Sequence, residues 1–269
     1  MVHWPLGHPG GGASRSDLFQ RRTMKLHLLG TTGYHPNDER QTACLMLPEL
    51  GIVLDAGTAM YRVRKYLCTP ELDIFLTHAH LDHVIGVTYL FDVLRDKNAH
   101  RVTVHAAPDK LAAIEQHLLN EALFPVKPPC EFRPLVAPVP LAAGGQLSYF
   151  ALDHPGGALG FRLDWPGHSM AYVTDTTAST ESAYVEAIRG VDLLVHECYF
   201  PDAMADMAQL TGHSVTSAVA RLAHDAQVGR LVLVHVSPSA DGEDPLKLAA
   251  ARVVFPETEL GYDLMEVEF

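Results

Sequence analysis

The chain has 269 residues, 48% of them hydrophobic and 19% charged, and its formal net charge is −12. This length suits one large domain or two small ones, and the composition is that of a globular protein. No apolar run approaches the roughly 18–20 residues of a membrane span, and the negative charge does not favour binding to nucleic acid phosphates.

The N-terminal region differs in composition from the rest of the chain. Residues 1–23 combine glycines and prolines without periodicity, which predicts a flexible extension before a folded domain over residues 24–269. The first residues lack the basic start and apolar core of a signal peptide, and the four cysteines form no CxxC pair. These features predict a protein of the reducing cytoplasm.

Strand-like runs dominate the first half of the predicted domain, and two of them flank a short turn at Pro48, Glu49 and Leu50 that reads as a hairpin. The predicted strands are 24–30, 42–47, 51–57, 72–77 and 102–106, and the predicted helices are 84–95 and 110–123. Pro108 stands near the start of the second helix, where proline is well tolerated.

The second half continues the alternation after a proline-rich segment, 124–140, which must be loop or sheet edge. The predicted strands are 146–154, 158–165, 169–175, 191–197, 231–236 and 262–269, and the predicted helices are 180–189 and 215–226. Paired strands in each half predict a mixed α/β fold of two packed sheets with helices outside them.

The stretch THAHLDH, at the end of the predicted strand 72–77, concentrates metal-binding side chains. On an extended backbone His78 and His80 point to the same side and can share one ion. Asp82 and His83 follow as the chain turns and can face a second point. Imidazole with carboxylate is the ligand set of zinc or a related transition metal. The alternative is a histidine-rich surface loop without a function.

Further ligands must complete such a site, and three candidates stand at the ends of apolar strands. These are His154, Asp175 and His235. Each one taken alone could be a residue that caps a strand or contacts solvent, but strand ends are where loops gather and sites form. Together with the first motif they predict a metal centre.

These motifs resemble those of the metallo-β-lactamase superfamily, and the match runs from Met24 to Phe269 with LGTTG, LDAGT and VTDT as supporting motifs. The resemblance implies an αββα sandwich of two mixed β-sheets flanked by helices. It also implies two divalent metal ions, with zinc expected and manganese or iron as alternatives. One metal would be held by His78, His80 and His154, the other by Asp82, His83 and His235, with Asp175 bridging them.

Within that superfamily, HPGGALGFRL, HECYF, GHSVTSAVARLA and LVHVSP resemble the ribonuclease Z and phosphodiesterase branch. The resemblance implies that Glu197 and His213 assist protonation of the leaving oxygen. It also implies that Asp82, besides binding metal, helps to orient a nucleophilic hydroxide between the metals. The alternatives are a buried, paired carboxylate for Glu197 and a packing role for His213. Arg162 is either an anion contact or an outward-facing strand residue.

The chain also departs from that branch. Ribonuclease Z carries a long arm for transfer RNA between the positions of His154 and Asp175, where this chain has only twenty residues that read as two strands and a turn. LDAGT lacks the fuller glycine–glutamate pattern of true ribonuclease Z, and no CxxC insert follows the first strand. The hydrolytic core is therefore expected to carry over without the transfer RNA arm.

We accordingly predict a dinuclear metal-dependent hydrolase, a phosphodiesterase that acts on a small anionic ester. Hydrolysis of an aryl sulfate, lactone or thioester is an alternative, because the same core can serve each bond. Transfer RNA 3′ processing is a further alternative, which the missing arm and the negative charge disfavour. The non-enzyme alternative is a metal-binding or redox module. A homodimer is left open, since dimers are common in this branch.

Overall fold

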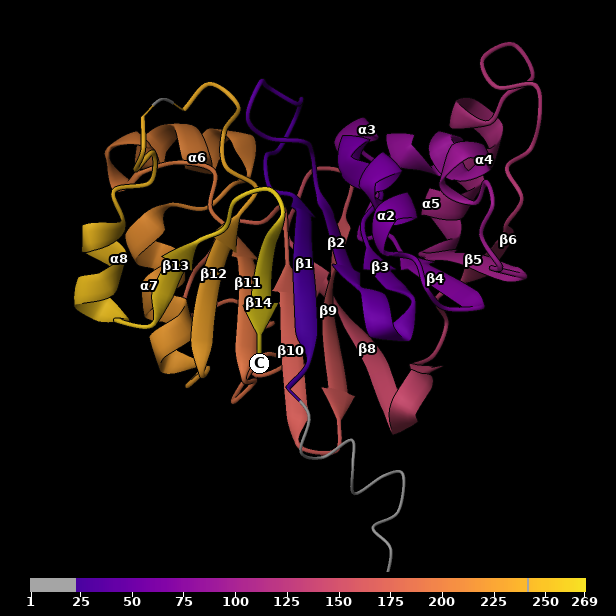
Figure 1. Ribbon diagram of the computed structural model, residues 1–269. Coiled ribbons are helices and arrows are strands. Elements are labelled where there is room, and N and C mark those ends of the chain that lie inside the picture. The colour runs from indigo at the N-terminus through magenta and orange to yellow at the C-terminus, as the bar shows by residue number, and fades with distance from the viewer. Residues whose placement is uncertain (1–22, 241) are drawn as a thin grey trace, which may run out of the picture.

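The computed structural model describes residues 23–240 and 242–269. The predicted extension over residues 1–23 therefore lies, apart from Thr23, outside the described residues. Two seven-stranded sheets pack face to face, and helices cover their outer faces (Figure 1). The predicted αββα sandwich of two mixed β-sheets is confirmed.

The first sheet has the strand order β14-β1-β2-β3-β4-β5-β6. Its strands are β1 (Lys25–Gly30), β2 (Cys44–Leu47), β3 (Ile52–Leu54), β4 (Glu71–Phe75), β5 (Arg101–Ala106), β6 (Glu131–Pro134) and β14 (Met265–Glu268). Pairing is antiparallel from β14 to β3 and parallel from β3 to β6. Parallel neighbours need crossover connections, and the crossover after β4 carries the histidine motif.

The second sheet has the order β13-β12-β11-β10-β9-β8-β7. Its strands are β7 (Val139–Leu141), β8 (Gly145–Leu152), β9 (Ala158–Trp165), β10 (His168–Val173), β11 (Leu193–Glu197), β12 (Arg230–Val234) and β13 (Thr258–Leu260). Pairing is antiparallel from β7 to β10 and parallel from β10 to β13. The proline-rich segment supplies β6 and the start of β7, an edge strand of each sheet, as its composition predicts.

Short helices connect the strands. The α-helices are α2 (Val63–Tyr66), α3 (Leu81–Val84), α4 (Leu90–Val93), α5 (Pro108–Ala113), α6 (Ala205–Thr211), α7 (Thr216–Asp225) and α8 (Leu248–Val254). The 3-10 turns are η1 (Pro48–Leu50), η2 (Thr58–Arg62), η3 (Ile85–Tyr89), η5 (Ala142–Gly144) and η6 (Asp202–Met204), and η4 (Ile114–Leu118) is a π-turn that extends α5. Within the described ranges, no helix has the length and apolar character to span a membrane.

The core has three layers because side chains on a strand alternate between its two faces. In β1, Leu26 and Leu28 pack between the sheets, whereas Leu29 packs under the helices of the first sheet. Phe75 and Phe161 meet across the two sheets with ring centroids 6.2 Å apart. Both faces of the central strands are therefore buried, which explains their nearly continuous apolar sequences.

The helix predicted at 180–189 is wrong, because this segment folds as successive turns. Its backbone bonds mostly span three residues, as from the Ser182 amide to the Ser179 carbonyl and from the Val185 amide to the Ser182 carbonyl. Burial of Tyr184 and Ile188 against the second sheet fixes this path without a regular helix. Apolar spacing alone could not distinguish the two arrangements.

Other helix boundaries also differ from the predictions. The predicted helix 84–95 is divided between α3, η3 and α4, and the predicted helix 110–123 ends at Leu118. There the Leu119 amide bonds the Ile114 carbonyl, and the Asn120 side chain then accepts a bond from the Ala122 amide in a turn. The sequence reading did not identify α6, α8 or β13, which are short and lack a long apolar pattern.

Candidate metal centre

The seven predicted metal ligands converge at one end of the sandwich. His78 and His80 follow β4, Asp82 and His83 lie on α3, His154 follows β8, Asp175 follows β10 and His235 follows β12. Figure 1 shows α3 over the upper end of the sheets. Because the carboxyl ends of parallel strands meet at one edge, segments far apart in sequence deliver their side chains to one place.

One cluster contains His78, His80, His154 and Asp175, whose donor atoms all lie within 4.8 Å of one another. His154 Nε2 lies 3.4 Å from His80 Nδ1. Oδ2 of Asp175 lies 3.6 Å from His78 Nε2 and 3.5 Å from His154 Nε2. The three imidazoles and this carboxylate oxygen therefore face a common point.

A second cluster contains Asp82, His83 and His235. The two imidazole Nε2 atoms lie 3.1 Å apart, and Asp82 Oδ2 lies 3.4 Å from His83 and 3.5 Å from His235. The other oxygen of Asp175, Oδ1, lies 3.3 Å from His83 Nε2 and 3.2 Å from His235 Nε2. Asp175 thus directs one oxygen at each cluster, which is the arrangement a bridging carboxylate needs.

The spacing of these atoms fits metal ions. Ligand atoms about 2.0–2.1 Å from one tetrahedral zinc ion lie roughly 3.3–3.4 Å from each other. The separations within both clusters fall around this value. In addition, His78 Nε2 is buried without a hydrogen-bond partner, although buried polar atoms normally have one. The residues present therefore fit two divalent metals, and their individual roles as ligands stay a prediction.

Asp55 orients one predicted ligand of each cluster. Its buried carboxylate accepts a hydrogen bond from His83 Nδ1 at 2.8 Å and another from the Tyr172 hydroxyl at 3.0 Å. It also accepts bonds from the amide and hydroxyl of Thr77, whose oxygen contacts His78 Nδ1 at 3.0 Å. Both imidazoles are thereby held with Nε2 toward the centre, as expected of the outer shell of a metal site. The sequence reading missed this role, although LDAGT contains the residue.

Backbone atoms fix two further predicted ligands. The Gly212 carbonyl lies 3.3 Å from His154 Nδ1 and can accept a hydrogen bond from it, which leaves Nε2 for the centre. The amide of Tyr34 donates to Asp82 Oδ2 at 2.7 Å. The loop after β1 and the turn before α7 therefore both contribute to the geometry of the site.

Several residues of the centre have backbone angles in the left-handed region, which costs non-glycine residues free energy. The φ angles are 58° at Asp55, 45° at Asp175, 59° at His235 and 61° at Tyr34. Such strain persists only where the surrounding structure enforces it, and it gathers at functional sites. Its concentration here supports a functional role for this end of the sandwich.

Burial and the charges of neighbouring side chains shift the pKa values of residues in both clusters. Burial lowers the pKa of His78 well below its ordinary value, whereas the charges of Asp175, Asp82 and Asp55 outweigh burial at His83 and raise its pKa well above the ordinary value. Burial alone would raise the pKa of Asp175, but His235, His83 and His78 outweigh it and hold that pKa well below the usual range. A ligating imidazole is neutral, so His83 would have to release its proton before it binds a metal.

Glu197 and His213 form a pair beside the two clusters. Glu197 is fully buried at the end of β11, and its Oε1 accepts bonds from His213 Nδ1 and from the Thr176 amide, both at 3.0 Å. Burial lowers the pKa of His213, but the hydrogen bond and charge of Glu197 outweigh it and leave that pKa raised. Because Thr176 follows Asp175, the same carboxylate also supports the position of Asp175.

Tyr199 also contacts this pair, a contact that the sequence reading missed. Its ring stacks on the His213 ring with centroids 4.4 Å apart and an interplanar angle of 15°, and it lies 5.7 Å from the His235 ring. Tyr199 comes two residues after Glu197 in HECYF, and that proximity was the available signal. The stack restricts the rotation of the His213 ring.

Arg162 has a structural role away from the centre. Its guanidinium bonds Asp164 at 3.0 Å and the carbonyls of Ala187 and Arg189 at 2.9 and 3.0 Å. These contacts fasten the turn segment 180–189 to β9. The interpretation of Arg162 as an outward-facing strand residue therefore describes it better than a role in anion binding.

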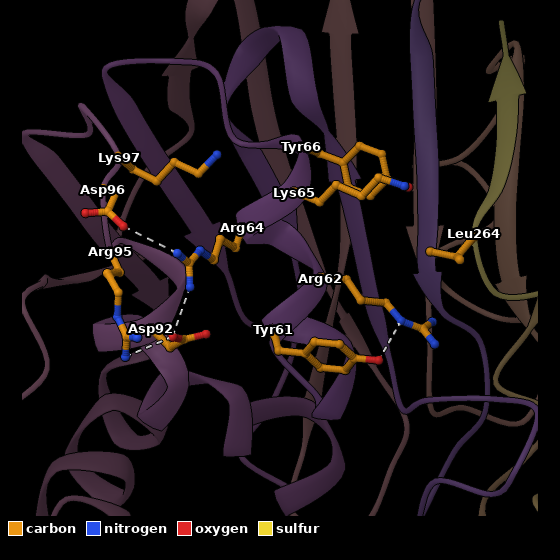
Figure 2. Close-up of a pocket in the computed structure, with 10 residues that line it drawn as sticks. All are labelled: Tyr61, Arg62, Arg64, Lys65, Tyr66, Asp92, Arg95, Asp96, Lys97 and Leu264. Carbon is orange, nitrogen blue, oxygen red and sulfur yellow. Dashed lines mark hydrogen bonds and ion pairs between the residues drawn. The ribbon is translucent and has the colours of Figure 1, made fainter.

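A separate cavity of about 730 Å³ lies beside η2, α2 and α4 (Figure 2). Several cations line it, but Arg64 pairs with Asp92 at 3.1 Å and Asp96 at 3.6 Å, and Arg95 pairs with Asp92 at 3.1 Å. Arg62 contacts Tyr61 within the cavity and pairs with a carboxylate outside it. These ion pairs compensate the three arginines, whereas Lys97 donates to the Leu67 carbonyl and Lys65 lies over the Tyr66 ring.

Comparison with known proteins agrees with this geometry. Residues 52–236 match the family described as the beta-lactamase superfamily domain. The chain belongs to this superfamily. Among curated relatives, ribonuclease BN from Citrobacter koseri is 25% identical to this β-lactamase superfamily chain over 302 aligned residues. The alignment covers 89% of this chain and 98% of that protein.

Two solved structures share the fold of this β-lactamase superfamily chain. YhfI from Bacillus subtilis, a metallo-beta-lactamase fold protein, superposes with a TM-score of 0.78 at 19% identity, covering 92% of this chain and all of that one. The short form of human tRNase Z gives a TM-score of 0.71 at 20% identity, covering 91% and 98%. The chain is thus a hydrolase of the metallo-β-lactamase fold, related to proteins named ribonuclease BN.

Proposed function

We propose that this hydrolase is a dinuclear metal-dependent phosphodiesterase that acts on a small anionic phosphate diester. The observation that carries the proposal is the Glu197–His213 pair, joined at 3.0 Å and placed against two donor clusters that share Asp175. A phosphodiester needs both charge neutralisation at phosphorus and a proton for the departing oxygen. The clusters and the pair are suited to these two requirements.

The ligand roles follow the two clusters. His78, His80 and His154 would hold one divalent ion, Asp82, His83 and His235 would hold the other, and Asp175 would contact both. When bound, such ions activate water and neutralise charge on a phosphoryl group. Imidazole with carboxylate favours zinc, while manganese and iron accept the same donors.

The chain's own residues would handle the leaving group. Glu197 holds His213 Nδ1, so that Nε2 of this imidazole is the atom available to donate a proton. Glu197 raises the pKa of His213 against the effect of burial, and it therefore favours the protonated form of this imidazole, which can donate. The stacked ring of Tyr199 keeps the imidazole in one orientation.

A small substrate is favoured by the connection between His154 and Asp175. This connection consists of β9, β10 and the short turns around them, without a protruding arm. A long nucleic acid would have to be held elsewhere, by a chain with a formal net charge of −12. We extend the proposal to a cytoplasmic enzyme.

Transfer RNA 3′ processing is the second candidate, and the similarity to ribonuclease BN along 98% of that protein favours it. Endonucleolytic cleavage of a precursor transfer RNA by the metal-loaded protein would support this candidate. Absence of that cleavage, together with turnover of a small diester, would leave the first proposal in place.

The proposal is tested with bis(p-nitrophenyl) phosphate and protein loaded with zinc or manganese. Release of p-nitrophenolate that depends on the metal is the expected result, and the loss of activity in His213→Gln should be larger on a dialkyl phosphate, whose leaving group needs a proton. His224→Gln is the control, because His224 is an exposed histidine on α7. Inactivity on the diester together with turnover of a lactone, thioester or aryl sulfate would overturn the proposal.

A further inference from the structure

An apolar trough of about 250 Å³ lies along the segment that carries the predicted metal ligands. One wall is formed by Ala79, Leu81 and Val84, and the other by Ala113, Ile114 and Leu118. Ala79 stands between His78 and His80, and Leu81 between His80 and Asp82. Because Val84 also follows His83, the residues of this wall adjoin four of the predicted ligands in sequence.

The opposite wall is positioned by α5 and its continuation η4. At the start of this helix, Lys110 Nζ donates a hydrogen bond of 2.5 Å to the carbonyl of Gly156, in the loop that follows His154. Gly156 in turn lies beside His80, because an added Cβ would be 4.0 Å from His80 Nε2. Residues three and four positions after Lys110, Ala113 and Ile114, share its helix face. This helix face therefore extends from Gly156, beside His80, to the wall of the trough.

The trough is shaped for an apolar occupant. Leu81 and Leu123 at its rim are 67% and 73% exposed, unusual for leucines that flank a concave surface. Of the described residues that line it, His117 alone carries a polar side chain. Its volume would hold roughly six to eight carbons, if each methylene takes about the 30 Å³ that a water molecule occupies in the liquid.

We propose that this trough binds an aliphatic chain of the substrate, so that the substrate is a phosphate diester with one alkyl arm. The proposal rests on the phosphodiesterase function proposed above. One segment of backbone connects the two sites. It directs His78, His80 and Asp82 toward the clusters on one side and forms a wall of the trough on the other. A substrate with its phosphoryl group at the clusters can pass its arm over the exposed rim at His80 and Leu81.

The trough is tested with p-nitrophenyl alkyl phosphates from methyl to octyl. In each, water attacks phosphorus, the bond to p-nitrophenolate breaks, and the alkyl phosphate remains. Because the arm must first cross the rim, we expect similar KM values for the shortest chains. From about butyl onward, KM should fall by about threefold to fourfold per methylene, the factor that corresponds to ~0.8 kcal/mol for each buried CH₂.

Two phenylalanine variants on one helix provide a matched comparison. Ala113→Phe places a ring in the trough and should remove the decrease of KM with chain length. Ala112→Phe places the same ring on the neighbouring position, outside the lining residues, and should retain that decrease. If the Ala113 variant does not fold, Leu123→Asp at the exposed rim is the second variant, and it should weaken the chain-length dependence.

The outcomes separate this inference from the proposed function. If KM does not vary with chain length while bis(p-nitrophenyl) phosphate is still cleaved, the inference about the trough is wrong and the proposed phosphodiesterase function is unaffected. If no diester is cleaved, calorimetric titration of the metal-loaded protein with methyl- and octylphosphonate decides: tighter octyl binding supports the trough, and equal binding overturns it. Leu123→Asp could instead change the association state of the protein and leave the dependence of KM on alkyl length unchanged. In that case the trough contacts a second copy of the protein, and the inference is wrong.

Discussion

Asp55 and His83 form a buried pair in which the imidazole Nδ1 donates to the carboxylate across 2.8 Å. Both side chains are fully buried, and the same carboxylate holds Thr77, which contacts His78. One residue that touches neither predicted metal position thus orients a ligand of each. Positions of this kind influence metal affinity strongly although they bind no metal themselves.

We expect Asp55→Asn to lower metal affinity by roughly 10–100-fold, because the amide has one accepting oxygen and cannot accept hydrogen bonds from both His83 and Thr77 as the two carboxylate oxygens do. Competition with a chromogenic chelator measures this. Asp73→Asn is the matched control, since Asp73 accepts a bond from His105 Nε2 at 2.9 Å in the same sheet but away from the clusters. Equal metal affinity in both variants and the parent chain would contradict the orienting role.

Asp175→Asn tests the bridging assignment. Its two oxygens face separate clusters at 3.2–3.6 Å, and an amide replaces one oxygen with a nitrogen that cannot bind metal. Elemental analysis of purified protein should show close to two metal ions in the parent chain and a clear loss in the variant. Asp153→Asn, an exposed aspartate beside His154, should keep the parent content. Unchanged metal content in Asp175→Asn would refute the bridge.

The pH dependence of kcat should reveal the effect of Glu197 on the pKa of His213. Glu197 raises the pKa of His213 against burial, so the protonated donor is lost only as pH rises through that raised pKa. In Glu197→Gln the pKa should fall, and the alkaline limb of the kcat profile should move to lower pH. General acid catalysis typically contributes about 10²–10⁴-fold, so kcat should also decrease.

The nature of the leaving group gives this prediction its control. A p-nitrophenolate departs readily without protonation, whereas an alkoxide does not. The loss in Glu197→Gln should therefore be larger for a dialkyl phosphate than for bis(p-nitrophenyl) phosphate. An alkaline limb at the same pH in both proteins, with equal losses on both substrates, would show that Glu197 acts only in folding.

Gly33→Ala should disturb the centre by a steric route. An added Cβ would lie 2.3–2.6 Å from three atoms of the His235 ring, so the imidazole would have to move. We expect reduced metal content and activity with a folded chain. Gly160→Ala is the control, because its Cβ would instead meet the Phe150 ring on the second sheet. Circular dichroism checks folding, and full metal content in Gly33→Ala would disprove the contact.

The sequence predicted the strands well because burial on a strand leaves a local record in its apolar residues. The runs at 72–77, 169–175 and 231–236 became β4, β10 and β12, and the polar residues at their ends are those that meet in the clusters. Helices were harder to predict. The turns at 180–189 bury residues at nearly helical spacing, and only contacts with the sheet exclude a helix there.

By itself, the sequence determined the two-sheet architecture and the seven candidate ligands, because alternation of apolar residues and donor-rich strand ends are local patterns. Only the tertiary structure decided which distant groups meet. It placed Asp55 under His83, stacked Tyr199 on His213 and set α5 opposite the ligand loop to form the trough. These relationships depend on strand order and on the packing of connections, which the periodicity of a single segment does not encode.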